Sequence, residues 1–291
     1  MNILVTGAKG QLGSELRRLS GWDCNNWVFT DLNADSSEGI AELDVLDTAA
    51  VAGMLESESI GLIINCASFT DVEKAEVNEE ASRLLNAFAP GNLAGLAAKA
   101  GAGLLHISSD FVFPGDGDAP LREEDPTGPL NVYGRTKLEG EKAVLESGCE
   151  GMVIRTAWLY SPYGTNFVKK ILGLMEERDV IDVVSDQVGS PTSAADLASF
   201  IIYVIRMDAF GQCRLCHFTG EGQVSRYEFA CAIKEISGSS CEVRPCCSAD
   251  YPSKARRPLF SALDCGLAWR EFGFVAPYWK DSLRECMSRM V

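Results

Sequence analysis

Residues 1–20 read MNILVTGAKGQLGSELRRLS and contain an apolar run, a glycine-rich turn and a helical pattern, in that order. The run Ile3–Thr6 is typical of a strand that is buried on both faces of a sheet. Gly7, Gly10 and Gly13 follow it with the spacing G-x-x-G-x-x-G. Such glycines allow a tight turn, close approach of the backbone to a pyrophosphate, and close packing of the helix on the strand. The stretch therefore predicts a dinucleotide site whose phosphates face the N-terminus of the helix.

Short apolar runs alternate with longer helical patterns through the first half of the chain. This rhythm is typical of βαβ units, so we expect an α/β fold with a Rossmann-type, doubly wound parallel sheet. The expected strands are 3–6, 28–30, 62–65, 104–108 and 153–155, and the expected helices are 11–19, 48–56, 79–100 and 131–145.

The alternation becomes less regular beyond residue 155. Helical patterns cover 166–177, 194–207 and 227–236, and the stretch 248–258 has no clear periodicity. We expect an NAD(P)-binding domain over residues 1–155, with a returning segment near 180–198 that includes a sheet strand at 180–185. A smaller, partly interwoven α/β substrate lobe is expected mainly over residues 156–291.

Composition limits the partners and the compartment. The 291 residues carry 26 Lys and Arg against 41 Asp and Glu, a formal charge of −15, which repels nucleic acid and acidic membrane surfaces. No apolar run approaches the ~20 residues of a membrane span. The opening MNILVTG lacks a basic segment followed by an apolar signal core, so we expect a cytoplasmic protein, monomeric or homodimeric.

The cysteines have a plain interpretation. Eleven are scattered along the chain, and in a reducing compartment they are expected to be small buried apolar residues. Cys213, Cys216 and His217 match the C-x-x-C-H pattern of c-type haem attachment, but that attachment implies export. Because the segment alternates like a short strand and the chain has two histidines, we expect neither haem nor zinc there.

Two charged residues bear on the choice of cofactor. Asp31 follows the second apolar run, 18 residues after Gly13, where an acidic group would accept hydrogen bonds from the adenosine ribose. Lys9 lies inside the glycine turn and could place a cation near a 2′-phosphate. We therefore expect both NADPH and NADH to be used.

The segment NVYGRTK, residues 131–137, supplies a candidate acid. Tyr133 and Lys137 are four residues apart, so on a helix they lie on one face. An ammonium beside a phenol is expected to lower the pKa of the phenol and to make it a usable proton donor. Ser109, which ends the fourth expected strand, completes a set with them.

With these residues in place, the chain resembles the dTDP-4-dehydrorhamnose reductase family of extended short-chain dehydrogenases/reductases. The matching blocks are GAKGQLGSEL, NCASFTDVEKAE, SSDFVFPGDGD, PLNVYGRTKLEGE, RTAWLYSPYGTNFV, VVSDQVGSPTSAADLA and SKARRPLFSALD. The resemblance implies that Tyr133 is the acid and that Lys137 binds the nicotinamide ribose. It places Ser109 where the family usually has a Thr, and Phe111 where it usually has a Tyr, which removes one substrate hydrogen bond.

The resemblance extends to further site residues. Pro90 interrupts a helical pattern and leaves the carbonyl of Asn86 without a donor; in the superfamily an Asn at such a kink extends the proton relay from the Lys. The implied catalytic residues are Ser109, Tyr133, Lys137 and Asn86. The implied cofactor contacts are Gly7, Lys9, Gly10, Gln11, Leu12, Gly13, Asp31, Asp44, Val45, Cys66, Ala67, Ser68, Tyr133 and Lys137. The implied substrate contacts are Thr70, Ser109, Asp110, Phe111, Trp158 and Arg257.

The implied activity is NAD(P)H-dependent reduction of the 4-keto group of a dTDP-linked deoxysugar, in dTDP-rhamnose and cell-surface polysaccharide synthesis. Two alternatives stay open: a nucleotide-sugar epimerase or dehydratase, and a non-catalytic NADP-binding subunit like the regulatory subunit of methionine adenosyltransferase. Some family members carry a metal between subunits at a position matching Glu15. Because Ala195 stands where a second carboxylate would be, with Asp196 one residue displaced, we predict no metal.

Overall fold

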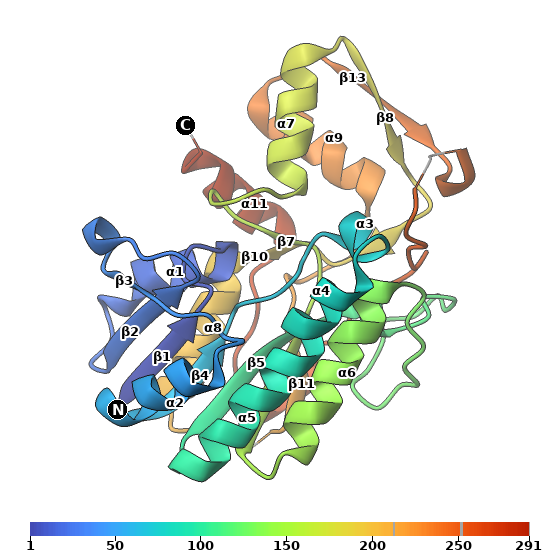
Figure 1. The fold of residues 1–291 in the computed structure, drawn as a ribbon. Helices are drawn as coiled ribbons and strands as arrows, with labels where there is room; N and C mark the ends of the chain where they lie inside the picture. The colour runs from blue at the N-terminus through green and yellow to red at the C-terminus, as the bar shows by residue number, and fades with distance from the viewer. Residues whose placement is uncertain (212, 251–252, 291) are drawn as a thin grey trace.

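A sheet of seven parallel strands forms the centre of the computed structural model, which describes residues 1–211, 213–250 and 253–290 (Figure 1). The order across the sheet is β11-β6-β5-β4-β1-β2-β3. The strands are β1 (Asn2–Thr6), β2 (Asn26–Asp31), β3 (Ile40–Glu42), β4 (Ile60–Asn65), β5 (Gly103–Ser109), β6 (Glu150–Thr156) and β11 (Leu215–His217). The expected doubly wound α/β fold is confirmed; β3 is an additional strand, and β11 lies in the segment whose alternation indicated a short strand.

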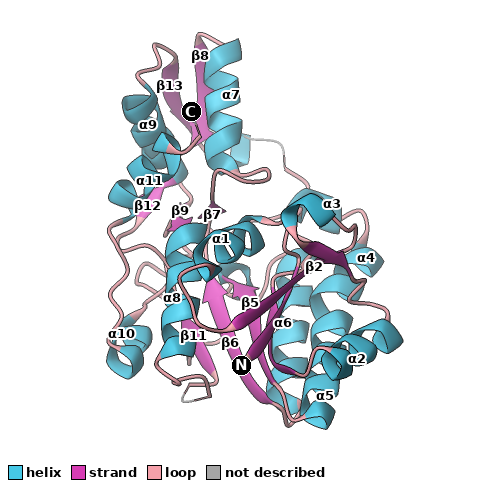
Figure 2. Ribbon diagram, turned by 90° about the vertical axis from the view of Figure 1, so that its left-hand side faces the viewer, coloured by secondary structure: helices cyan, strands magenta, loops and turns pink. Residues whose placement is uncertain are grey.

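Helices cover both faces of this sheet because consecutive side chains on a strand point to opposite sides. Ile3 and Val5 of β1 belong to one apolar core with Leu16, whereas Leu4 belongs to a second core with Leu93. The first core is covered by α1 (Gln11–Ser20) and α8 (Ala194–Arg206), and the second by α2 (Thr48–Ser57), α5 (Ala89–Ala100) and α6 (Val132–Glu146) (Figure 2). Burial on both faces explains why the central strands read as continuous apolar runs.

The long helix expected at 79–100 is divided into three parts. These are α4 (Glu79–Arg83), a π-helical turn (Leu84–Phe88) and α5, in which Pro90 is near the first position. A proline in a helix interior removes a hydrogen bond and clashes with the preceding turn. The widened π-helical turn accommodates this disruption and places Asn86 at the irregular point.

The apolar core of the second lobe is built around the ring of Phe229. The Phe229 ring stacks on Phe167 with 5.5 Å between centroids and also contacts Trp158, Tyr160 and Trp279. The helices of the lobe are α7 (Phe167–Glu177), α9 (Arg226–Ser237) and α11 (Trp279–Ser288).

The strand expected at 180–185 forms, but its expected place in the main sheet is wrong. β8 (Val180–Val184) pairs in parallel with β13 (Glu242–Cys246) as a separate two-stranded sheet in the second lobe. Ile181 and Val183 are buried while Asp182 is exposed, so only one face of β8 is covered. A central strand of the main sheet would need both faces to be apolar.

The elements that return to the first half of the chain are α8, which packs on α1, and β11, which pairs with β6. We keep residues 1–155 and 156–291 as the proposed domains, with α8 and β11 as the interwoven parts. Two short strand pairs lie within the second half: β7 (Leu159–Tyr160) with β10 (Thr192–Ser193), and β9 (Val188–Gly189) with β12 (Val224–Ser225).

The remaining elements are short. They are α3 (Val72–Ala75), α10 (Gly266–Phe272) and 3₁₀ turns at Ser36–Glu38, Asp110–Val112 and Ser248–Asp250. The irregular stretch expected at 248–258 begins with the last of these turns, and its residues 251 and 252 lie outside the described ranges. In the described ranges, we find no helix whose length and apolar character would let it cross a membrane.

Candidate active site

The carboxyl ends of β1, β2, β4 and β5 open on a cleft of about 830 Å³. This is the edge of a doubly wound sheet at which ligands bind, beside the point where the strand order reverses. Three expected site residues lie outside it: Lys9, Asn86 and Arg257. The expected residues that line it are Gly7, Gly10, Gln11, Leu12, Gly13, Asp31, Asp44, Val45, Cys66, Ala67, Ser68, Thr70, Ser109, Asp110, Phe111, Tyr133, Lys137 and Trp158.

The glycine turn combines a structural and a binding requirement. Gly7 has φ +67°, and a Cβ there would lie 2.7 Å from the backbone nitrogen of Ala67. A Cβ on Gly13 would lie 2.3 Å from the carbonyl oxygen of Gly7, whereas one on Gly10 would meet only that oxygen, at 3.2 Å. Gly10 also precedes α1 without a side-chain cap, so the first N–H groups of the helix are available to a ligand. The turn therefore fits a dinucleotide pyrophosphate.

Asp31 and Lys9 are placed differently from each other. Asp31 ends β2, lines the cleft and accepts hydrogen bonds from the backbone N–H groups of Lys9 and Leu32, each at 2.9 Å. The Lys9 ammonium instead donates to the carbonyl of Ala34 at 3.3 Å, and Lys9 does not line the cleft. The role of Lys9 as a cation at the cofactor site therefore stays a prediction.

The start of α6 is held at the carboxyl end of β5 and places Tyr133 in the cleft. Asn131 caps the helix and donates to the carbonyl of Arg256 at 2.8 Å. The backbone N–H of Val132 donates to the carboxylate of Glu76 at 2.7 Å. These contacts fix the helix entry from two sides.

Tyr133 lies against the loop that follows β5. The ring of Phe111 packs edge-on against it with 5.8 Å between centroids. Burial is the main cause that raises the pKa of Tyr133 to about 12; a side-chain hydrogen bond with Ser109 lowers it and the charge of Asp110 raises it. The phenol is therefore protonated at neutral pH and can act as a proton donor.

Lys137 lies one helical turn further and is 2% exposed. Its ammonium donates to the carbonyl of Ile107, and burial lowers its pKa to about 8, although the charges of Glu141 and Cys66 oppose that shift. The expected lowering of the Tyr133 pKa by Lys137 is not seen in this structure. The physical reason is that burial outweighs other influences on Tyr133, and the ammonium is directed at a backbone carbonyl.

Asn86 lies behind the cleft wall. Its side-chain oxygen accepts from Ser68 Oγ and from the N–H of Phe69, both at 2.8 Å. Its Nδ2 donates to the carbonyl of Phe69 at 3.0 Å and to Thr136 Oγ1 at 3.2 Å. Asn86 thus ties the loop after β4 to α6, and its role in a proton relay stays a prediction.

The substrate end of the cleft contains a residue that the sequence reasoning missed. Arg226 lines the cleft and stacks on Trp158, with its guanidinium carbon 3.5 Å from the ring centroid. The capping box that Ser225 and Glu228 form at the start of α9 was the available signal for its position. Trp158 itself has φ +47°, a strained conformation for a bulky residue, and such strain gathers at functional sites.

Arg257, the expected substrate contact, is engaged elsewhere. Its guanidinium forms an ion pair with Glu73 at 2.7 Å and donates to the carbonyl of Ala255 at 3.2 Å. The ion pair holds Arg257 outside the cleft lining, and its role as a substrate contact stays a prediction.

The C-x-x-C-H segment lies in and beside edge strand β11. Cys216 and His217 are fully buried, and the His217 ring is hydrogen-bonded to the carbonyl of Leu121 at 3.1 Å. Burial lowers the pKa of His217 to about 3. The segment therefore forms part of the core of the sheet.

Glu15 is buried and pairs with two cations, Arg18 at 2.8 Å and Arg289 at 2.9 Å. Asp196 accepts a hydrogen bond from Ser282. Within the described ranges, no group of three or more His, Cys, Asp or Glu side chains could hold a metal ion.

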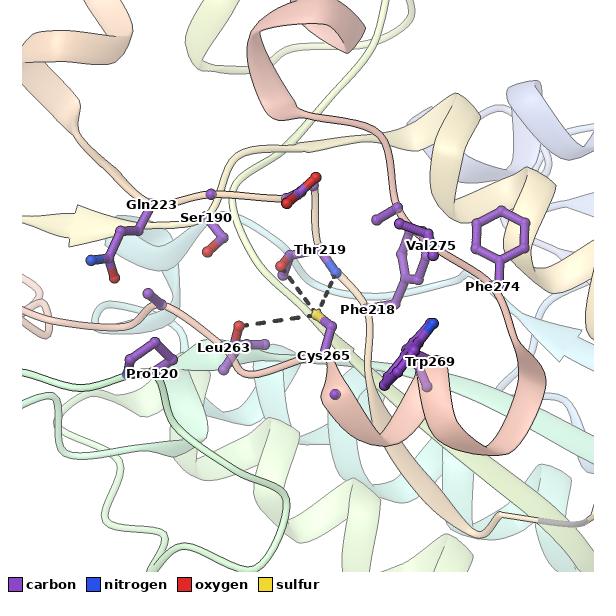
Figure 3. A pocket seen from close by; sticks show the side chains of 17 residues that line it. Pro120, Ser190, Phe218, Thr219, Gln223, Leu263, Cys265, Trp269, Phe274 and Val275 are labelled. Carbon is purple, nitrogen blue, oxygen red and sulfur yellow. Dashed lines mark hydrogen bonds between the residues drawn. The ribbon is translucent and has the colours of Figure 1, made fainter.

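A smaller cavity of about 340 Å³ lies beside α10, as Figure 3 shows. Its walls are mainly apolar, with Phe218, Leu263 and Trp269 among them. Cys265 accepts a hydrogen bond from the N–H of Thr219 at 3.2 Å, and burial raises the pKa of its thiol to about 11. Its described lining residues include no Lys, Arg, His or Tyr, so the larger cleft is the candidate active site.

The comparisons with known proteins agree with this geometry. The family described as RmlD substrate binding domain matches residues 1–291. A dTDP-4-dehydrorhamnose reductase of Aggregatibacter actinomycetemcomitans is 35% identical over 291 residues, covering 97% of each chain. A probable dTDP-4,6-dihydroxy-2-methyloxan-3-one 4-ketoreductase of Streptomyces antibioticus is 40% identical, covering 98% of this chain and 94% of the relative.

Among solved structures, a dTDP-4-dehydrorhamnose reductase from Bacillus anthracis in complex with NADP superimposes with a TM-score of 0.90. It is 31% identical, and the match covers 100% of this chain and 99% of that one. Both the sequence and the fold are therefore matched from end to end, and the chain belongs to the RmlD substrate binding domain family.

Proposed function

We propose that this chain is an oxidoreductase that uses NADPH or NADH to reduce the 4-keto group of a dTDP-linked deoxysugar. The reaction is the conversion of dTDP-4-dehydrorhamnose to dTDP-L-rhamnose, a step in cell-surface polysaccharide synthesis. The observation that carries the proposal is that Ser109, Tyr133 and Lys137 share one cleft with the glycine turn. The names of the relatives from A. actinomycetemcomitans and B. anthracis support the choice of substrate and cofactor.

The residues of the cleft fit such a cofactor. The N–H groups at the start of α1 would hold the pyrophosphate, Asp31 the adenosine ribose and Lys137 the nicotinamide ribose. When bound, the nicotinamide supplies the hydride that reaches the sugar carbonyl carbon. Tyr133 donates its proton to the oxygen that becomes an alkoxide, and Ser109 stabilises that oxygen by a hydrogen bond.

The charge of the chain supports narrower proposals about its surroundings. With a formal charge of −15, the chain is expected to bind neither nucleic acid nor an anionic membrane surface. We place it in the cytoplasm, as a monomer or a homodimer.

A second substrate is favoured by the S. antibioticus relative, whose name denotes a dTDP-linked methyloxanone. Loss of NADPH absorbance should therefore be followed with dTDP-4-dehydrorhamnose and with that ketone. Net NADPH consumption with either supports reduction. Redox-neutral conversion of a nucleotide sugar would indicate an epimerase or dehydratase, and tight NADPH binding without turnover would indicate a regulatory subunit.

A further inference from the structure

Asp110 is a buried carboxylate, one oxygen of which forms no hydrogen bond within the described residues. It begins the 3₁₀ turn after β5, lines the cleft and is 2% exposed. Its Oδ1 accepts a hydrogen bond from Ser109 Oγ at 2.9 Å, and the Ser261 hydroxyl lies near enough to lower the pKa of the carboxyl, but Oδ2 forms no hydrogen bond of ordinary geometry among the described residues. An unsatisfied buried carboxylate oxygen is costly, and in native proteins it calls for a missing partner.

Arg226 is a half-buried cation whose N–H donors lack acceptors among the described residues, and it thus complements Asp110. Its guanidinium lies over Trp158 and 5.0 Å from the ring centroid of Phe167, so two aromatic rings hold it in place. A guanidinium has five N–H donors. In the described part of the chain, none of them forms a hydrogen bond or an ion pair, and the charges that act on the guanidinium are those of Asp110 and Arg257.

The two groups influence each other across the cleft. Burial is the main cause that raises the pKa of Asp110 to about 6 and lowers the pKa of Arg226 to about 9. Their mutual attraction opposes both shifts but does not cancel either. Each group therefore retains hydrogen-bonding capacity for a ligand that lies near both.

The proton of Ser109 adds a constraint. A serine hydroxyl has one O–H donor, and here Ser109 gives it to Asp110. Under the proposed function, Ser109 must instead donate to the keto oxygen of the substrate. Asp110 Oδ1 then loses the hydrogen bond from Ser109 and needs another donor.

We propose that Asp110 and Arg226 together bind the hydroxyl group on the ring carbon next to the keto carbon of the substrate. The hydroxyl donates to Asp110 and accepts from Arg226, which releases Ser109 to hold the keto oxygen. Oxygens on adjacent ring carbons are close enough to reach Ser109 and Asp110, which are neighbours in the chain. A phosphate would be repelled by Asp110, so a neutral group with both a donor and an acceptor fits the pair better. This inference rests on the proposed function.

The test compares two substrates in the full-length protein. One is a dTDP-4-keto-6-deoxy sugar with the neighbouring hydroxyl, and the other is its 3-deoxy analogue. The variants are Arg226→Gln and Asp110→Asn, with Arg244→Gln as a matched control, because Arg244 is an exposed arginine of the same lobe that pairs with Glu242. Loss of one charge-assisted hydrogen bond should lower kcat/KM by roughly 10- to 100-fold with the hydroxyl substrate.

The same variants should act on the 3-deoxy analogue nearly as the wild type does, and Arg244→Gln should change neither substrate. If Arg226→Gln lowers kcat/KM equally with both substrates and also binds dTDP more weakly by calorimetry, Arg226 contacts a phosphate and the proposal is overturned. Unchanged kcat/KM in both variants would also overturn it. If the wild type is folded, as melting curves would show, but oxidises NADPH with neither of the two 4-keto sugars, the proposed function itself fails.

Discussion

Replacing Asp110 with asparagine should remove a pH-dependent cost from the folded state. The carboxyl is buried, and its pKa is raised from 3.8 to about 6, mainly by burial. At neutral pH the fold must keep this group charged, whereas the unfolded chain does so without cost. A shift of this size corresponds to about 3 kcal/mol of unfolding free energy.

The sign follows from the number of bound protons. Between pH 4 and pH 6 the folded chain holds the Asp110 proton and the unfolded chain has lost it, so this group lowers stability as the pH rises. Below the unfolded pKa the cost is absent, and above the folded pKa it is complete. Between pH 5 and pH 6 the expected change is about 1 kcal/mol, because the folded carboxyl loses its proton progressively over this interval.

Denaturant unfolding of the wild type and of Asp110→Asn over pH 5 to 7.5 measures this difference. The stability of the variant relative to the wild type should increase with pH, and any constant cost of the new amide cancels in the comparison. Asp186→Asn is the control: burial raises the pKa of Asp186, but hydrogen bonds from Ser248 outweigh burial and lower it below 3.8, so its profile should run parallel to that of the wild type over this pH range. Parallel pH profiles for the wild type and Asp110→Asn would refute the reasoning.

Three further predictions concern the proposed chemistry. Tyr133→Phe should lower kcat at least ~100-fold, as expected for loss of a general acid, with unchanged NADPH affinity by calorimetry; near-normal turnover would contradict the assignment. Gly10→Val should remain folded, because its Cβ meets only one oxygen at 3.2 Å, but should lose NADPH binding, whereas Gly13→Val should fail to fold because of its 2.3 Å contact. NADPH and NADH should give kcat/KM values within about thirtyfold, since exposed charges discriminate weakly, and Asp31→Ala should move the ratio towards NADPH; an unchanged ratio would show that Asp31 does not face the ribose.

The parts of the fold that could be predicted are those with a local signal. The strand–glycine–helix order at residues 1–20 and the apolar central strands are visible in the sequence and are confirmed. β3 has three residues, too few for a periodic pattern, and it forms because β2 offers an edge; β11 lies in the segment that alternates like a short strand, but its place beside β6 had no local signal. β8 was predicted in the wrong sheet because the partner of a strand depends on the tertiary fold and not on its local sequence.

The site divides in a similar way. Tyr133 and Lys137 are one helical turn apart, so their approach was predictable from spacing alone. Arg226 enters the cleft through a lobe far away in sequence, and no local pattern indicates its stacking on Trp158. The resemblance implied that Arg257 binds substrate, but no local pattern indicated its ion pair with Glu73, which lies far earlier in the chain.

The acidic character of the chain restricts which groups of the cleft can hold anionic ligands. Among the described residues that line it, Lys137 and Arg226 are the only cationic side chains, and Asp31, Asp44 and Asp110 are acidic. A pyrophosphate must therefore be held largely by backbone N–H groups, and the start of α1 supplies these with about half a positive charge from the helix dipole. Arg226 stacks on Trp158, and under the proposal above its charge serves the substrate. Under these proposals, backbone N–H groups of the glycine turn bind the pyrophosphate and the side chain of Arg226 binds the sugar.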